Sequence, residues 1–257
     1  VWALSLPADH SGPASAEQGG EATVGKGVVQ PTYAGAAHTI PGAAKIWMAH
    51  NHPSGVLEVS QADQRITKRI SALLVGSGVE VQGHVLLGGG QDTFTTMKRN
   101  GDVESMGNKI TPAARTKKVK VFTRKIVGKQ DGVSLRSPAD TEGLLRRMGN
   151  PEGIVLLNNR HKYLGFLTMT PEEMRQLKNT GQSGRVIKAM AEMNAAAYIV
   201  STKQEETGAA NNMYSFSQVA DWRMLDAVYL DSNGAMESMA SQGTLVGNAS
   251  PATFYQS

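Results

Sequence analysis

The segment HNHPSGVLEVSQAD, residues 50–63, joins a short apolar run to an amphipathic one. The residues before it, KIWMA (45–49), have the length and apolar character of a buried strand. After it, Ser60 is a suitable helix N-cap, and apolar residues repeat at helical spacing through residues 60–76. A further strand is expected at 79–87, where three glycines end the apolar run. With a short strand at 2–6 as well, this part of the chain is expected to form an α/β unit.

Two histidines end the strand expected at 45–49 and lie two residues apart. Strand geometry places the side chains of His50 and His52 on one face, so both imidazoles can reach one metal ion. The chain then turns at PSG, and Asp63 in the first turn of the following helix can supply a third ligand. Three protein ligands with a fourth position left to water are typical of catalytic zinc. The competing interpretation, which a lone His-x-His would favour, is a group of polar surface residues.

The composition limits the kinds of site and the location of the chain. The 257 residues include no cysteine, which excludes disulfides and Cys-ligated zinc. No apolar run reaches the length of a membrane-spanning helix, and the N-terminal segment lacks the pattern of a signal peptide. We therefore expect a soluble, cytoplasmic protein without membrane contact. Because the chain begins with Val1, we also expect it to be a fragment of a larger polypeptide.

Most of the net charge of +4 comes from a polar, basic stretch at residues 98–132. Its main interpretation is a solvated linker. The alternative is a weak contact with nucleic acid or an acidic partner, because basic clusters attract phosphate. Only Phe122 is available there to stack on a base. The basic residues of the stretch include Lys109, Arg115, Lys117, Lys118, Lys120, Arg124, Lys125 and Lys129.

A second unit of helices and strands follows the basic stretch. A helix is expected at 137–148, with Ser137 as its N-cap, and a strand hairpin at 153–170. Another helix is expected at 186–197, followed by a strand. The segment 215–230 closes the folded part, and the Gly- and Ser-rich residues 233–257 are expected to be a loose tail.

The two units align at a constant offset of 152 residues, which indicates an internal repeat. The offset pairs WALSL with IVLLN and residues 41–50 with 193–202, and one inserted residue then pairs SQAD (60–63) with SQVAD (217–221). At the two histidine positions the second unit has Thr202 and Gln204, which cannot hold a metal.

The run HNHPSG, followed by Ser60 and Asp63, resembles the JAMM/MPN+ metalloprotease motif and in particular the RadC-like JAB domain. SQADQRITKRI and GVEVQGHVLLGG are further matches, and SPADTEGLLRRM and GIVLLNNRHKYLGF also look RadC-like. The resemblance implies an α/β (α+β) fold with two cytidine-deaminase-like JAB/MPN domains, each a mixed sheet flanked by helices. The expected boundaries are 1–97 for the metal-binding domain, 98–132 for the linker, 133–232 for a degenerate MPN−-like domain and 233–257 for the tail.

The same resemblance implies a chemistry: Zn²⁺ on His50, His52 and Asp63, and a glutamate that activates water for amide hydrolysis. The repeat places Glu17 opposite Met169, where that base should lie, and Glu21 is the alternative. Ser60 would stabilise an oxyanion as well as cap its helix. His84 matches a histidine of the family and is expected in the core or behind a ligand.

The partners implied are a protein or peptide substrate, such as a ubiquitin-like modifier, and a second domain paired within the chain or in a homodimer. Two other functions stay open. One is a DNA-repair or mobile-element accessory protein of the RadC type. The other is a scaffold in which the second domain supports the first.

Overall fold

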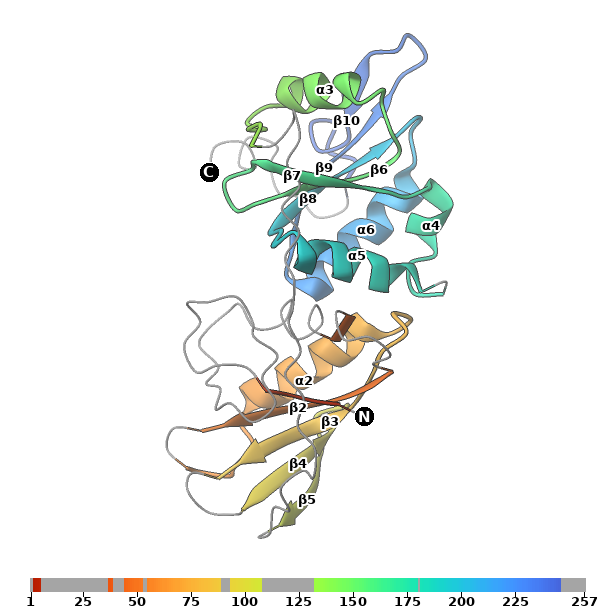
Figure 1. Ribbon diagram of the computed structural model, residues 1–257. Coiled ribbons are helices and arrows are strands. Elements are labelled where there is room, and N and C mark those ends of the chain that lie inside the picture. Colours follow the sequence, from red (N-terminus) through yellow and green to blue (C-terminus); the bar gives the residue numbers. More distant parts are fainter. Residues whose placement is uncertain are drawn as a thin grey trace. The chain divides into compact units, whose positions relative to one another are not determined.

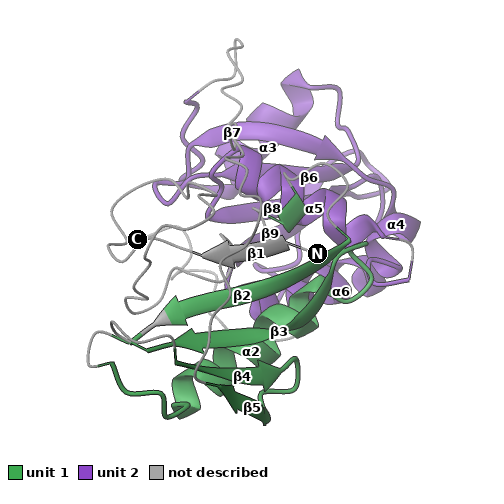
Figure 2. Ribbon diagram, turned by 60° about the horizontal axis from the view of Figure 1, so that its bottom comes forward, with its two compact units in different colours: residues 1–122 green, residues 123–257 purple. Residues whose placement is uncertain are grey.

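The chain forms two compact units, residues 1–122 and 123–257, in a computed structural model (Figures 1 and 2). The structure describes residues 2–5, 37–38, 44–52, 55–88, 93–107, 132–179 and 181–245. Each unit contains a five-stranded mixed sheet with helices packed on it, which confirms the expected α/β class. Over these residues, no helix has both the length and the apolarity that a bilayer crossing would need.

The sheet of the first unit has its strands in chain order. Strands β1 (Trp2–Ser5), β2 (Lys45–Asn51) and β3 (Glu80–Leu87) are parallel, and helix α2 (Gln61–Leu74) joins β2 to β3. Strand β4 (Phe94–Lys98) pairs antiparallel with β3, and strand β5 (Val103–Gly107) pairs antiparallel with β4. The sheet therefore extends past residue 97, where the basic linker was expected to begin.

One face of β2 is covered by α2, as Figure 1 shows. Alternate residues Ile46, Met48 and His50 are buried, as expected for a strand with one face toward a core. The inward side of α2 repeats at helical spacing and completes this core with Thr67, Ile70, Leu73 and Leu74.

A β-bulge between β2 and β3 decides which side chains of β3 face α2. Ile46 pairs with Val81, but Trp47 pairs with Gly83, so β3 holds one extra residue. Because side chains alternate along a strand, this extra residue brings His84 onto the face of Met48 and His50. Without the bulge, His84 would point to the opposite face of the sheet.

The second unit has sheet order β10-β9-β8-β6-β7. The strands are β6 (Gly153–Leu157), β7 (Tyr163–Thr168), β8 (Ala197–Thr202), β9 (Arg223–Leu230) and β10 (Met236–Ser238). Helix α3 (Pro138–Arg147) covers one face, and α5 (Gln182–Glu192) and α6 (Thr207–Ala220) cover the other (Figure 1). A short helix, α4 (Pro171–Arg175), follows β7.

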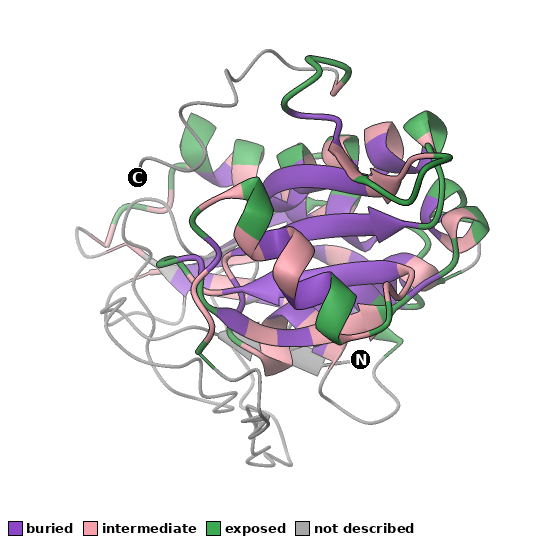
Figure 3. Ribbon diagram, turned by 90° about the horizontal axis from the view of Figure 1, so that it is seen from above, coloured by how far each residue is buried: buried purple, intermediate pink, exposed green. Residues whose placement is uncertain are grey.

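The central strands of this sheet are buried on both faces, seen as continuous purple arrows in Figure 3. All residues of β6 and β8 are buried, as expected for strands between two helical layers. The core under α3 includes Leu144, Leu145, Val155, Ile199 and Leu225.

The chain after β9 is more ordered than its composition predicts. Asp226 is fully buried and accepts hydrogen bonds from the Ser238 hydroxyl (2.6 Å) and the Ala240 amide (3.0 Å). These bonds attach β10 and the following turn to β9. Residues 233–245 of the expected loose tail therefore belong to the folded unit.

The two units share part of their chain path, although the expected alignment is wrong in two places. The order β2-α2-β3-β4 returns as β8-α6-β9-β10, and β8 and β9 carry a bulge at the corresponding position, between Tyr198 and Ile199. However, SQVAD (217–221) ends α6, whereas SQAD opens α2. Strand β6 also runs antiparallel to β8, while β1 runs parallel to β2. The common path supports a repeat, which stays a proposal.

The bulge makes Gly83 a position with no room for a side chain. A Cβ there would lie 2.5 Å from the Met97 carbonyl oxygen and 2.6 Å from the ring of Trp47. Gly83→Ala is expected to lower the free energy of unfolding of the first unit by about 1–3 kcal/mol, since overpacking forces neighbours to move. Thermal and urea denaturation of the purified variant measure this.

Gly143 provides the control, because it lies within α3 and a Cβ there would meet only the end of Arg147 at 3.4 Å. Gly143→Ala should stabilise the second unit by about 0.5–1 kcal/mol, as alanine is favoured within helices. An unchanged or raised stability of Gly83→Ala would contradict the account of the bulge.

Candidate metal centre

Three potential metal ligands from two elements meet at the C-terminal end of β2. Ligand atoms of His50, His52 and Asp63 all lie within 4.8 Å of one another. The Nε2 atom of His50 is 3.1 Å from Oδ1 of Asp63, and that of His52 is 3.3 Å from Oδ2. The structure thus brings together the three residues that the sequence assigned to a metal.

The backbone places both histidines on the side of the sheet that α2 covers. His50 lies near the end of β2 with 4% of its surface exposed, and His52 follows the strand with its side chain 21% exposed. The chain then turns, with a hydrogen bond from the Gly55 amide to the His52 carbonyl (2.9 Å). Gly55 has φ 71°, a left-handed conformation that suits glycine. One ligand therefore lies in the core and the other at its rim.

Asp63 is fixed by the cap of its own helix. Its amide donates to the Ser60 hydroxyl oxygen (3.1 Å), while its Oδ2 accepts from the Ser60 amide (2.8 Å) and hydroxyl (2.7 Å). Burial alone would raise the pKa of Asp63, but its contacts with His50 and the hydrogen bonds from Ser60 outweigh burial and hold that pKa well below its usual range. The carboxylate is therefore ionised, and its rotamer is set before any ligand binds.

The outer nitrogens of the two histidines have partners that leave the inner nitrogens free. Nδ1 of His52 lies 2.9 Å from the Val56 carbonyl oxygen, which can only accept, so Nδ1 carries the proton. Nδ1 of His50 lies 2.7 Å from Nε2 of His84. When His50 donates there as well, both Nε2 atoms direct lone pairs toward the Asp63 carboxylate.

A metal ion fits this set of atoms. Two imidazole lone pairs and a carboxylate repel one another unless a cation lies between them. Ligands at the usual zinc distances in a tetrahedron are about 3.3 Å apart. The separations here are similar, 3.1 Å from Nε2 of His50 to Oδ1 of Asp63 and 3.3 Å from Nε2 of His52 to Oδ2, so each histidine faces a different oxygen of the carboxylate. Two nitrogens and one oxygen also match the ligand types that zinc takes in catalytic sites.

His84 lies directly behind His50, as expected for a histidine in the core or behind a ligand. It is 3% exposed, and its ring centroid is 4.7 Å from that of His50. Burial is the main cause that lowers the pKa of His84 to about 3; the nearby His50 and His52 also act to lower it, while Asp63 acts in the opposite direction. His84 is therefore neutral and can accept a hydrogen bond.

Thr67 belongs to the same constellation and was not singled out from the sequence. It is fully buried, and its hydroxyl contacts Nδ1 of His84 at 2.8 Å and the Asp63 carbonyl at 2.6 Å. Its position four residues after Asp63, on the same face of α2, was the available signal. The two candidate bases, Glu17 and Glu21, lie outside the described residues.

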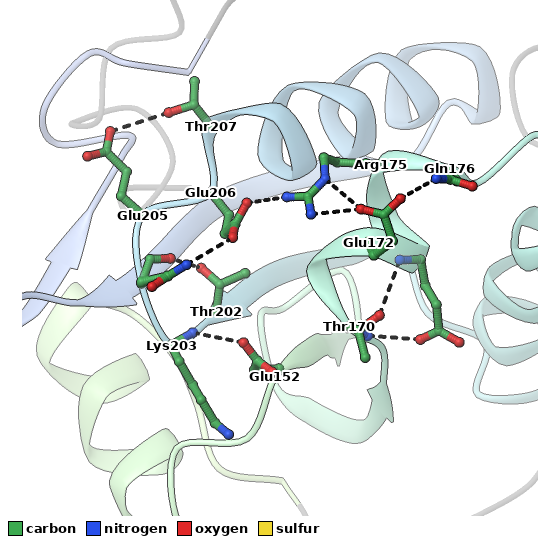
Figure 4. A network of polar contacts seen from close by, with 12 residues as sticks. Glu152, Thr170, Glu172, Arg175, Gln176, Thr202, Lys203, Glu205, Glu206 and Thr207 are labelled. Carbon is green, nitrogen blue, oxygen red and sulfur yellow. Dashed lines mark hydrogen bonds and ion pairs between the residues drawn. The ribbon is translucent and has the colours of Figure 1, made fainter.

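The corresponding place in the second unit holds polar contacts of another kind. Thr202 donates to the Gln204 carbonyl oxygen (2.7 Å), and the third residue of α6 is Ala209 where α2 has Asp63. Figure 4 shows Arg175 bridging Glu172 and Glu206 beside this strand end. Among the residues that the structure describes in this unit, no group of metal ligands is found.

Comparison with known proteins places the metal centre within a recognised domain. Residues 17–102 match the family model of the RadC-like JAB domain. UPF0758 proteins of Aliivibrio fischeri, Vibrio vulnificus and Idiomarina loihiensis are 55%, 51% and 50% identical to this chain over 49, 49 and 48 residues. Each alignment covers 19% of this chain, and 22%, 22% and 21% of the respective relative.

The chain thus covers about a fifth of the length of these relatives. No solved structure gives a significant match to it. The second unit lies beyond the matched residues, so its degenerate relationship to the first is not confirmed by these comparisons. The candidate ligands His50, His52 and Asp63 all lie within the residues, 17–102, that match the RadC-like JAB domain.

Proposed function

We propose that the first unit is a zinc-dependent hydrolase that cleaves an amide bond in a protein or peptide. The observation that carries this proposal is the convergence of His50, His52 and Asp63, whose potential ligand atoms all lie within 4.8 Å of one another. A site held by two buried residues and one at the rim leaves an approach for substrate. A purely structural role would need a fourth protein ligand, and the described residues provide three.

Each residue has a separate task in this scheme. His50, His52 and Asp63 would hold the ion through Nε2, Nε2 and a carboxylate oxygen. When bound, zinc polarises a carbonyl group and lowers the pKa of a water molecule toward 7. Glu17 or Glu21 would accept a proton at its carboxylate and deliver it to the leaving amine.

The structure supports a more restricted role for Ser60 than the one that the resemblance to the JAMM motif implies. Its hydroxyl donates to Oδ2 of Asp63 at 2.7 Å and so orients a metal ligand. To stabilise an oxyanion as well, the hydroxyl would have to turn away from that carboxylate. Orientation of Asp63 is therefore the task that the hydrogen bonds support, and direct contact with substrate stays a proposal.

The substrate class follows from the reaction and the resemblance. An amide at the C-terminus of a ubiquitin-like modifier is one candidate, and other peptides share the same bond. The basic residues that favoured a nucleic-acid contact lie outside the described residues, so no contact of theirs supports the accessory function. Pairing with the second unit, or a homodimer, would add a scaffold role without changing the chemistry.

Metal binding can be tested with Asp63→Asn, which keeps the shape of the side chain and removes its charge. The wild type should bind Zn²⁺ or Co²⁺ at one site, and the variant should bind more than about 100-fold more weakly. Loss of an outer partner alone costs about 10–100-fold, and Asp63 is a ligand itself. Isothermal titration with Zn²⁺ and the visible spectrum of the Co²⁺ form measure the affinity.

Asp140→Asn is the matched control, because Asp140 makes the same cap in α3. The Ser137 hydroxyl donates to its carboxylate at 2.9 Å, and its amide donates to that hydroxyl oxygen at 3.2 Å. Asp140→Asn therefore loses a comparable cap interaction, worth about 0.5–2 kcal/mol, yet should bind metal like the wild type. Equal metal affinities for wild type and Asp63→Asn would refute the site.

Hydrolysis is tested by cleavage of an internally quenched peptide library by the zinc-loaded chain. Glu17→Gln and Glu21→Gln are assayed beside the wild type, and the variant that loses about 100-fold or more in rate identifies the base. Both variants should retain zinc. Cleavage should also stop when EDTA removes the metal. Three equal rates would exclude both glutamates, and no cleavage by the zinc-loaded wild type would argue against a peptidase.

A further inference from the structure

A continuous chain of side chains runs from the backbone of Asp63 to its own carboxylate. Thr67 lies one turn after Asp63 on the inward face of α2, and His84 lies on β3 beside it. The successive contacts are Asp63 O to Thr67 Oγ1 (2.6 Å), Thr67 Oγ1 to His84 Nδ1 (2.8 Å) and His84 Nε2 to His50 Nδ1 (2.7 Å). His50 Nε2 then faces Asp63 Oδ1 at 3.1 Å.

We propose that Thr67 acts through His84 as a positioning residue that keeps the proton of His50 on Nδ1 and leaves Nε2 free for a ligand. The functional meaning of this inference rests on the proposed metal site. The inference itself concerns where protons lie in the protein and can be tested without metal.

The direction of every hydrogen bond follows from one backbone carbonyl. The Asp63 carbonyl oxygen can only accept, so the single proton of the Thr67 hydroxyl points to it. The Thr67 oxygen must then accept from Nδ1 of His84. A histidine that is neutral and protonated on Nδ1 has a bare Nε2, which can accept the proton on Nδ1 of His50.

This arrangement opposes a competing attraction at His50. The ionised Asp63 carboxylate, 3.1 Å from Nε2, would favour a proton on that nitrogen, which would block it as a ligand. If the Thr67 hydroxyl turned to His84 instead, its oxygen and the Asp63 carbonyl oxygen would face each other at 2.6 Å with no proton between them. The cost of that contact keeps the chain in the direction that frees Nε2.

The proton of His52 is placed without a second residue of this kind. Its Nδ1 faces the Val56 carbonyl oxygen, which can only accept a hydrogen bond. The partner of His50 is another imidazole, which can donate or accept according to its own tautomer. The Val56 carbonyl oxygen thus fixes the proton of His52 on Nδ1 directly. Thr67 does the same for His50 through His84.

The test is Thr67→Val, which keeps the shape of this fully buried side chain and removes its hydroxyl. In the metal-free wild type at pH 8, ¹⁵N NMR of histidine-labelled protein should show the proton of His50 on Nδ1 and that of His84 on Nδ1. In Thr67→Val, His84 loses its acceptor, and the His50 proton should move to Nε2 although Thr67 is joined to His50 only through His84 in this series of hydrogen bonds. The zinc affinity should fall by about 10–100-fold.

Thr67→Ser retains a hydroxyl and should restore both the tautomer and the zinc affinity. Thr141→Val is the matched control for a lost helix hydroxyl, since Thr141 is also fully buried and donates to the carbonyl four residues earlier (3.5 Å). It should change neither measurement. Circular dichroism confirms that each variant is folded.

A proton on Nε2 of His50 in the wild type, or an unchanged His50 tautomer in Thr67→Val, would overturn the proposal. If the wild type failed to bind zinc while the tautomers behaved as expected, the metal site would be refuted and the proton arrangement would stand. The two proposals therefore fail separately.

Discussion

The first unit depends most on the close approach of His50, His52 and Asp63, whose ligand atoms lie within 4.8 Å of one another. His50 and Asp63 expose 4% and 8% of their surfaces, so water screens the charges there poorly. The surrounding groups fix the site: the amide and hydroxyl of Ser60 donate to the Asp63 carboxylate, Nδ1 of His52 donates to the Val56 carbonyl oxygen, and Nδ1 of His50 faces Nε2 of His84. The ion that we propose for this site would lie among groups already held in place before it binds.

The sheet contributes to the candidate metal site through the register in which its strands pair. Parallel strands joined by α2 bring the end of β2 and the first turn of the helix to the same edge, which is where ligands gather in α/β folds. The bulge opposite Trp47 then turns His84 toward His50. The bulge is therefore what brings His84 into contact with His50, and the bulge is possible because Gly83 has no side chain.

The sequence predicted the local elements well because their signals are local. The His50-x-His52 pair, the Ser60 cap and the position of Asp63 on the first turn all follow from spacing along one strand and one helix. The bulge was not predictable, since it depends on how β2 and β3 pair across about 35 intervening residues. For the same reason the contact between Thr67 and His84 was missed. The repeat alignment erred at SQVAD because similar letters occur at opposite ends of two helices.

The Ser-x-x-Asp sequence occurs at the start of both α2 and α3, and the comparison separates capping from metal binding. Asp63 and Asp140 each accept a hydrogen bond from the serine hydroxyl three residues before and have lowered pKa values, for Asp140 chiefly through the Arg136 amide. Only Asp63 lies opposite a strand that ends in two histidines. The cap therefore orients both carboxylates and helps to lower their pKa values, and at Asp63 the contact with His50 lowers the pKa as well. The histidines, with the proton arrangement behind His50, are what convert a common helix cap into a candidate ligand.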